Sequence, residues 1–338
     1  MEALTSRTST RAGIARSAAL PPAYLPPWAR FESHPGGAWR RARLHLALRL
    51  MAKRMRTGRA DIPLLRAKGA AFDLKFAQPD PARRSTRLAG DGVPAEWIDV
   101  PESRPDRVLL YLHGGAFLFR FPNLHATLAA RWARPLRARI LMVDYRLAPE
   151  HPYPAAPDDC HAAYRWLLAQ GASAKSIVIA GDSAGGNLAL VTLQRIKAAT
   201  EPLPACAVVL SPVVDFTLSG ASLLTNERSD PMFTLAGLLA MRSLYARPEH
   251  FLDISISPLF GDWRGLPPLL FQAGDIEVLR DESVRAAERA RAAGVDVELE
   301  IWDRMAHVFQ ALALLPQSAL AAERCVRFIA KHTGWYSA

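Results

Sequence analysis

Residues 176–187 of the chain read SIVIAGDSAGGN, and this stretch determines how the rest of the sequence is interpreted. Residues 176–180 form a short apolar, β-branched run that predicts a buried strand. Residues 181–185, GDSAG, then fit the G-x-S-x-G pattern, in which a strand turns sharply into a helix and leaves the side chain of Ser183 exposed. Glycine is needed on both sides of this turn because a side chain there would clash with neighbouring backbone. Residues 188–196 carry the apolar positions of the following helix, so the stretch is typical of a nucleophilic serine.

The composition indicates a folded globular protein with a large core. The chain has 338 residues, half of them hydrophobic, and no apolar run reaches the roughly 18 residues of a membrane span. The three cysteines, Cys160, Cys206 and Cys325, are far apart and lack the spacing of metal ligands. We therefore expect reduced core thiols, no metal and a cytoplasmic location.

The net charge of +10 is concentrated at the N-terminus. Residues 1–60 contain twelve Arg or Lys and two acidic residues, whereas the rest of the chain contains thirty of each. The start of this segment is rich in Ser, Thr, Pro and Gly and is expected to be poorly ordered. From Ala38 to about Arg59 we predict a helix with one apolar face and an opposite basic side. The apolar positions are Leu44, Ala47, Leu48, Met51 and Met55, and the basic ones are Arg49, Lys53 and Arg56.

Three interpretations of this basic helix are open. It could form a lid on the main domain with its arginines in water, lie on an anionic membrane surface, or contact nucleic acid. The lid is favoured because a run of charges is usually a solvated face.

From residue 70 onward, strand and helix patterns alternate, which predicts a mostly parallel sheet with helices on both faces. The expected strands are 71–77, 95–100, 107–113, 138–145, 176–180, 205–210, 269–273 and 295–301. The expected helices include 124–133, 157–169 and 318–331.

An insertion interrupts this alternation between Asp215 and Pro267, where only a helix at Leu235–Tyr245 is predicted. Insertions between sheet strands usually lie over the strand ends, where ligands bind in open α/β sheets. Together with the N-terminal helix, this segment is expected to form a cap over Ser183.

A nucleophilic serine needs hydrogen-bond donors for the oxyanion and a histidine as base. In Leu110–Phe117, two glycines directly follow a buried strand, so the N–H groups of Gly114 and Gly115 are predicted donors, with that of Ala184 as the third. The order serine, acid, histidine requires a base after Ser183, which leaves His250, His307 and His332. We choose His307 because it lies in a loop directly after the last expected strand.

The acid is expected in the loop after strand 269–273. Asp275, Glu277, Asp281 and Glu282 all lie there. Asp281 and Glu282 are expected to begin the next helix, where acidic residues are favoured. We choose Glu277, and Asp275 remains the alternative.

The stretches Leu112–Phe117, 144–156 (DYRLAPEHPYPAA) and Gly181–Asn187 resemble the bacterial hormone-sensitive lipase family of α/β-hydrolase carboxylesterases. The likeness extends from about residue 90 to 335. It implies an α/β-hydrolase fold with a helical cap, an oxyanion hole at Gly114, Gly115 and Ala184, and hydrolysis of short-chain acyl esters without a cofactor. Many members have Asp-Pro-Leu where this chain has Glu277-Val278-Leu279. This departure resembles the subgroup that uses glutamate, but it leaves Asp275 open.

The resulting prediction is an N-terminal helical cap segment, residues 1–65, followed by a catalytic domain, residues 66–338, with a cap insertion at about 215–250. The predicted activity is that of a serine carboxylesterase with a Ser183–His307–Glu277 triad and an acyl-enzyme intermediate. An amidase or formamidase with the same triad is the alternative. A receptor built on an inactive hydrolase is disfavoured because His307 is present.

Candidate pocket residues complete the prediction. They are Phe117, Asp182 and Met232, together with Phe119, Phe233 and Leu238, and the aromatic and aliphatic ones could equally form the core of the cap. The expected partner is a small-molecule ester, with no nucleic acid and no membrane contact through the basic N-terminus. Whether the chain forms a homodimer is left open.

Overall fold

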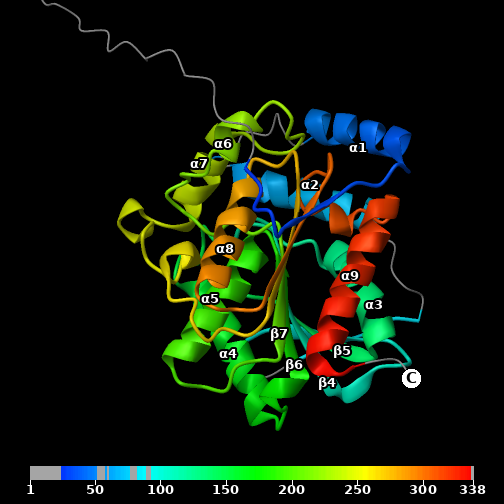
Figure 1. Ribbon diagram of the computed structural model, residues 1–338, viewed down its shortest axis with the longest axis vertical. Coiled ribbons are helices and arrows are strands. Elements are labelled where there is room, and N and C mark those ends of the chain that lie inside the picture. The colour runs from blue at the N-terminus through cyan, green and yellow to red at the C-terminus, as the bar shows by residue number, and fades with distance from the viewer. Residues whose placement is uncertain (1–23, 52–57, 59–60, 77–81, 89–92, 336–338) are drawn as a thin grey trace, which may run out of the picture.

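The computed structural model describes residues 24–51, 58, 61–76, 82–88 and 93–335, and these residues form a nine-stranded sheet between helices (Figure 1). The strand order is β1-β9-β8-β7-β6-β4-β5-β3-β2. Only β2 with β3 and β3 with β5 pair antiparallel, so the expected mostly parallel sheet is confirmed. The strands are β1 (Arg30–Glu32), β2 (Arg84–Arg87), β3 (Ala95–Asp99), β4 (Arg104–Leu112), β5 (Ala138–Val143), β6 (Ile177–Asp182), β7 (Cys206–Leu210), β8 (Leu269–Gly274) and β9 (Val297–Trp302).

Helices cover both faces of the sheet, as alternating side chains on buried parallel strands require. On β4, Leu110 and Leu112 pack into one core cluster, whereas Leu109 and Tyr111 pack into another on the opposite face. The first cluster includes α4 (Ala155–Ala169), α5 (Ala184–Ala198) and α8 (Arg280–Ala292), and the second includes α3 (Pro122–Leu136) and α9 (Pro316–Thr333) (Figure 1). Short 3₁₀ turns lie at η2 (Ala174–Ser176), η3 (Pro248–His250), η4 (Pro258–Phe260) and η5 (Phe309–Ala311).

The remaining helices lie together at one end of the molecule (Figure 1). They are α1 (Ala38–Met51), α2 (Ile62–Phe76), α6 (Ser222–Thr225) and α7 (Leu235–Tyr245). The helix predicted within the insertion is confirmed with the bounds expected for it. We call these four helices and the loops between α6 and α7 the cap.

The prediction of a strand at 71–77 is wrong, because residues up to Phe76 belong to α2, and residue 77 lies outside the described residues. In α2 the buried side chains are Ile62, Leu65 and Asp73, at helical spacing. The Asp73 carboxylate accepts the backbone N–H groups of Asn123 at 3.0 Å and Leu124 at 2.7 Å, and so satisfies the start of α3. A short apolar run fits a strand and a helix equally well. The contact that accompanies the helix joins Asp73 to the start of α3, about fifty residues further along the sequence.

The N-terminal segment also contributes to the sheet, which was not predicted. Residues Arg30–Glu32 pair parallel with Glu300–Trp302 as the edge strand β1. The Glu32 carboxylate accepts a hydrogen bond from Arg324 at 2.6 Å. Such a three-residue strand has no local signal, because its stability comes from a partner strand far along the chain.

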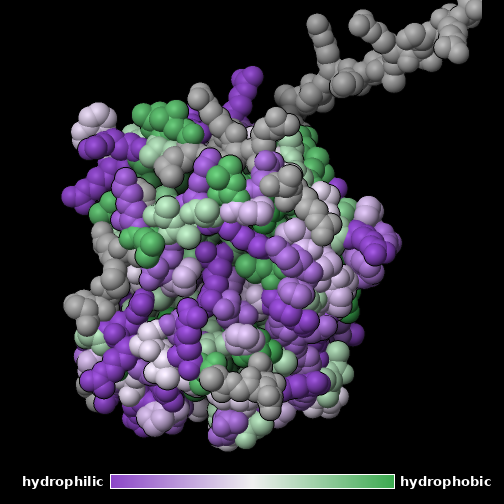
Figure 2. Space-filling view, turned by 180° about the vertical axis from the view of Figure 1, so that it is seen from behind, coloured by the Kyte–Doolittle hydropathy of each residue, from purple (hydrophilic) through white to green (hydrophobic). Residues whose placement is uncertain are grey.

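Helix α1 buries only part of the predicted apolar face. Leu48 is buried and Leu44 partly buried, as expected, but Arg41 is buried as well and Ala47 is exposed. Met55, Lys53 and Arg56 lie outside the described residues. The outward side exposes the large apolar residues Trp39, Leu46 and Leu50. From behind, hydrophobic side chains show among hydrophilic ones at the upper end, where the cap lies (Figure 2).

The three cysteines are buried and free, as expected for core thiols. Among the helices that the structure describes, none combines the length and the apolar character needed to cross a bilayer.

Candidate active site

Ser183 lies at the turn between β6 and α5, with φ 54° and ψ −118°. This left-handed backbone is rare for a residue with a side chain and is held here by tight packing. A Cβ atom on Gly181 would lie 2.2 Å from Gly185 O, and one on Gly185 would lie 1.9 Å from Leu112 O. The expected steric need for both glycines is therefore confirmed.

His307 and Glu277 meet at the same edge of the sheet, from the loops after β9 and β8. The distance between His307 Nδ1 and Glu277 Oε2 is 2.7 Å, and both side chains are buried. Since a glutamate oxygen accepts, the arrangement favours the tautomer with the proton on Nδ1. In the described part of the chain, the buried Nε2 atom has no hydrogen-bond partner and can accept a proton.

Ser211, at the end of β7, connects the two sides of the site. Its hydroxyl donates to Glu277 Oε1 at 2.7 Å and accepts the N–H of Val308, next to His307, at 3.2 Å. The preceding residue, Leu210, accepts the N–H of Ser183 at 2.8 Å. Sequence reasoning missed Ser211, although a hydroxyl directly after a buried strand beside the elbow strand was a usable signal.

The electrostatic surroundings favour a protonated His307. Burial alone would lower its pKa. The charge of Glu277, its hydrogen bond, and the charges of Asp230 and Asp182 outweigh this effect, so the pKa lies above the usual value for histidine.

The other candidate acids and bases lie elsewhere. The Asp275 carboxylate faces the Arg280 guanidinium at 3.9 Å, and its backbone N–H donates to Trp302 O. His250 is partly exposed beside Asp253, and His332 lies on α9. Glu277 is therefore the carboxylate that the fold brings to His307.

The loop after β4 differs from the prediction at one position. The N–H of Gly114 donates to Asp182 Oδ1 at 3.0 Å, so it is not available to an oxyanion. Within the described chain, no hydrogen bond uses the N–H groups of Gly115, Ala116 or Ala184. Ala116, with φ 55°, was missed, although it directly follows Gly115 in the same turn.

Asp182 supports this loop and is buried, which favours a structural role over the predicted place in the substrate pocket. Its carboxylate also accepts the hydroxyl of Tyr111 at 2.8 Å and lies 3.3 Å from His125 Nε2. Burial would raise the pKa of Asp182, but the charge of His125 and these hydrogen bonds outweigh it and lower the pKa. A buried, ionised carboxylate with three partners holds Gly114 in place.

Phe117 belongs to an aromatic cluster beneath the cap. Its ring stacks on Tyr245 of α7 with centroids 3.8 Å apart, and Phe216 lies 5.8 Å away. Phe117 is 3% exposed, which favours the core interpretation. Phe119 and Leu238 likewise pack against core clusters.

Phe233 lies closer to the candidate triad. Its ring meets His307 edge-on, with centroids 4.9 Å apart and an interplanar angle of 83°. Met232, the residue before it, is partly buried. Phe233 therefore covers the imidazole from the cap side.

Comparison with known proteins agrees with this arrangement. Residues 109–311 match the model of a family described by the alpha/beta hydrolase fold. An acetyl-hydrolase of Streptomyces hygroscopicus is 40% identical over 244 residues, covering 71% of this chain and 80% of the relative. An esterase of Acinetobacter venetianus is 39% identical over 234 residues, covering 67% and 74%.

Solved structures are also similar. An esterase from the bacterial hormone-sensitive lipase (HSL) family superposes with a TM-score of 0.83 at 39% identity, covering 88% of this chain and 99% of the other. The α/β-hydrolase fold predicted from the sequence is confirmed.

Proposed function

This chain belongs to the bacterial hormone-sensitive lipase family of α/β-hydrolase carboxylesterases, and we propose that it hydrolyses short-chain acyl esters through a Ser183–His307–Glu277 triad. Relatives named esterase, carboxylesterase and acetyl-hydrolase support ester hydrolysis. The observation that carries the triad is the 2.7 Å contact between His307 Nδ1 and Glu277 Oε2, while Nε2 has no hydrogen-bond partner among the described residues.

In this mechanism His307 Nε2 takes the proton of Ser183 as Oγ attacks the ester carbonyl carbon. Glu277 keeps the proton on Nδ1 and stabilises the imidazolium that forms. His307 then protonates the leaving alcohol, and an acyl group remains on Ser183. Water, deprotonated by the same Nε2, attacks this acyl-enzyme, and its breakdown releases the acid and restores the Ser183 hydroxyl.

We assign the oxyanion hole to the N–H groups of Gly115, Ala116 and Ala184. The N–H groups in the loop after β4 and at the start of α5 that bond to no described residue support this set, whereas Gly114 supports the loop through Asp182. Loss of one such donor typically costs about 3 kcal/mol in the barrier.

The short acyl chain rests on the acetyl-hydrolase among the relatives and on family resemblance.

The test is hydrolysis of p-nitrophenyl esters from acetate to palmitate by the wild type, Ser183→Ala and Glu277→Gln, with Asp275→Asn as matched control. We expect activity to peak at short chains, to vanish with Ser183→Ala, and to fall on the order of 10⁴-fold with Glu277→Gln. Asp275→Asn should remain close to wild type. Full activity of Glu277→Gln would refute the assigned acid, and amide turnover equal to ester turnover would favour the amidase alternative.

A further inference from the structure

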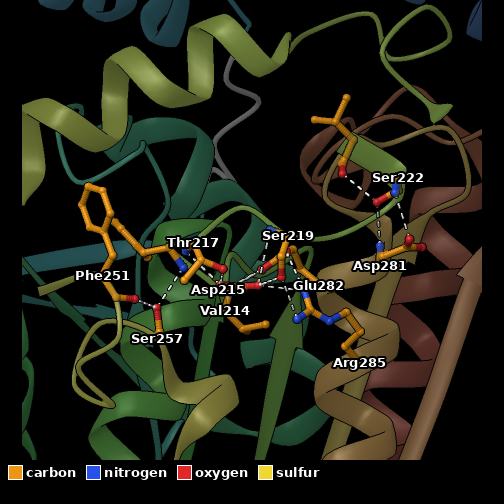
Figure 3. Close-up of polar contacts among 12 residues, drawn as sticks. Val214, Asp215, Thr217, Ser219, Ser222, Phe251, Ser257, Asp281, Glu282 and Arg285 are labelled. Carbon is orange, nitrogen blue, oxygen red and sulfur yellow. Dashed lines mark hydrogen bonds and ion pairs between the residues drawn. The ribbon is translucent and has the colours of Figure 1, made fainter. Parts of the chain in front are cut away.

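The insertion between β7 and β8 begins with a polar attachment to α8, the helix that follows the Glu277 loop (Figure 3). The backbone N–H groups of Val214 and Asp215 both donate to Glu282 Oε2, each at 2.8 Å. The Asp215 carboxylate in turn pairs with Arg285 at 2.8 Å. Since Glu282 and Arg285 lie on the first turns of α8, the start of the insertion cannot shift without that helix.

A second attachment follows at Ser222, in α6. The Ser222 hydroxyl donates to Val278 O at 2.7 Å and accepts the N–H of Asp281 at 3.0 Å (Figure 3). The Asp281 carboxylate accepts the N–H of Ser222 at 2.9 Å. Through Val278, these contacts hold the residue directly after Glu277.

Asn226 bonds to the acid loop itself, which we define as residues 275–278. Its side-chain amide donates to the carbonyl oxygens of Asp275 at 2.9 Å and Glu277 at 2.8 Å. One amide nitrogen therefore bonds to the backbone on both sides of residue 276.

Asp230 bonds to the same loop and also orients the cap residues over His307. Its Oδ2 atom accepts the N–H of Val278 at 2.8 Å. Its Oδ1 atom accepts the N–H groups of Met232 at 2.7 Å and Phe233 at 3.0 Å. The buried Asp230 carboxylate thus links the acid loop to the aromatic ring that meets His307 edge-on.

The backbone hydrogen bonds within the acid loop are long, although the N–H of Gly274 also donates to the Glu277 carboxylate. The N–H of Glu277 lies 3.5 Å from Gly274 O, which is long for a hydrogen bond. The carbonyl of Glu277 accepts Arg280 N at 3.2 Å. The shorter bonds to the loop backbone between Glu277 and Val278 come from the insertion.

We propose that Asn226 and Asp230 are positioning residues, which hold the acid loop and Phe233 so that Glu277 and His307 keep their catalytic alignment. The inference rests on the proposed triad and goes further, because it makes the cap part of the machinery that aligns the reacting groups. Neither residue needs to touch the substrate. A misplacement of about 1 Å in such a site can lower the rate about 10²-fold.

The charge of Asp230 allows a separate test of this proposal, through the pKa of His307. It is one of the charges that raise the pKa of His307, together with Glu277 and Asp182, against the opposing effect of burial. Removing the Asp230 charge should lower that pKa. Since His307 must be neutral to act as a base, the acidic limb of the kcat/KM profile should move to lower pH.

The experiment compares Asn226→Ala and Asp230→Asn with the wild type on p-nitrophenyl acetate. Leu224→Ala, at an exposed neighbouring position in α6, is the control for Asn226, and Glu249→Gln, which removes an exposed charge elsewhere in the insertion, is the control for Asp230. We expect kcat to fall about 10²-fold in both test variants with KM within about threefold, and both controls to match the wild type. Asp230→Asn preserves side-chain volume and decides the question if Asn226→Ala does not fold.

Two readouts separate positioning from a general structural role. The low-field proton resonance of His307 Nδ1–H should shift or broaden in both variants, and the acidic limb should move to lower pH in Asp230→Asn. Wild-type kcat in both variants would overturn the proposal, and so would a lower kcat with an unchanged resonance and pH limb.

The resonance does not depend on turnover, so it also separates this proposal from the proposed function. If the wild type were inert on every ester, the proposed activity would be wrong, yet a changed resonance in the two variants would still support positioning.

Discussion

The two halves of the proposed triad are built in different ways. The serine half is local, because β6, Ser183 and α5 are contiguous and the close approach of Gly181 to Gly185 spans five residues. The acid–histidine half is assembled from distant segments: Glu277 and His307 are 30 residues apart, and Ser211 is 66 residues from Glu277. The comparison teaches that backbone sterics hold the nucleophile, whereas hydrogen bonds between separate loops hold its base.

Among the variants that test this difference, Gly185→Ala should have the largest effect. Its new Cβ atom would lie 1.9 Å from the backbone oxygen of Leu112, which cannot move aside as a side chain could. We expect a loss of about 3 kcal/mol or more in the free energy of unfolding and no ester turnover. Urea unfolding with an activity assay measures both.

Gly237→Ala, in α7, is the control, because its Cβ atom would meet only side-chain atoms at 3.3 Å and beyond. Wild-type stability of Gly185→Ala would contradict the steric account of the serine half.

Ser211→Ala should have the next largest effect, and it tests the acid–histidine half. It removes the hydroxyl that donates to the Glu277 carboxylate at 2.7 Å, a bond to a charged group worth about 1.5–3 kcal/mol. We expect kcat to fall about 10- to 100-fold. Ser257→Ala, which removes another buried hydroxyl bonded to Phe216 N and Phe251 O, should reduce stability and leave kcat close to wild type. Equal kcat losses in the two variants would argue against a specific role for Ser211.

The pH dependence of kcat/KM also tests the acid–histidine half, with a smaller expected effect. Burial alone would lower the pKa of His307, but Glu277, Asp230 and Asp182 raise it above the ordinary value of about 6.5. The base must be neutral, so activity should be lost as the pH falls through this raised pKa. The kcat/KM profile of the wild type should therefore have an acidic limb above pH 6.5, and a limb below about pH 6 would contradict these electrostatics.

The smallest effect is expected for Arg49→Ala, in α1. Arg49 Nη2 donates to the carbonyl oxygens of Arg228 at 3.1 Å and Ser229 at 3.2 Å, in the segment that contains Asn226 and Asp230. Because this contact is exposed, we expect a change in kcat of less than about threefold. Arg43→Ala on the same helix is the matched control. A tenfold loss confined to Arg49→Ala would show that α1 helps to hold the acid–histidine half.

Much of the fold could be predicted because its signals are local. The strands from β3 to β9 and the helices α3, α4, α7 and α9 have apolar patterns that are complete within one element. The failures occurred where local patterns were ambiguous or absent. Residues 71–77 were expected to be a strand, but residues up to Phe76 are helical, and Asp73 in this helix contacts the start of α3. Strand β1 forms only through its pairing with β9.

The same division applies to the site. Ser183 and the loop after β4 follow from contiguous motifs, and His307 follows from chain order and its place after a strand. Ser211, Asn226 and Asp230 are ordinary polar residues in the sequence, and only their contacts with the acid loop distinguish them. Asp182 was predicted to line the pocket, because a carboxylate beside the nucleophile has the same sequence pattern whether it faces a substrate or supports a loop.

The sequence by itself determined the elbow at Ser183, the mostly parallel sheet and the helix at Leu235–Tyr245, because strand, turn and helix preferences act over a few consecutive residues. Only the tertiary structure decided that Glu277 and not Asp275 contacts His307, and that the N–H of Gly114 bonds to Asp182 whereas that of Ala116 bonds to no described residue. Neighbouring residues in a loop have similar local preferences. Their different partners are selected by hydrogen bonds and burial between segments that lie far apart in the chain.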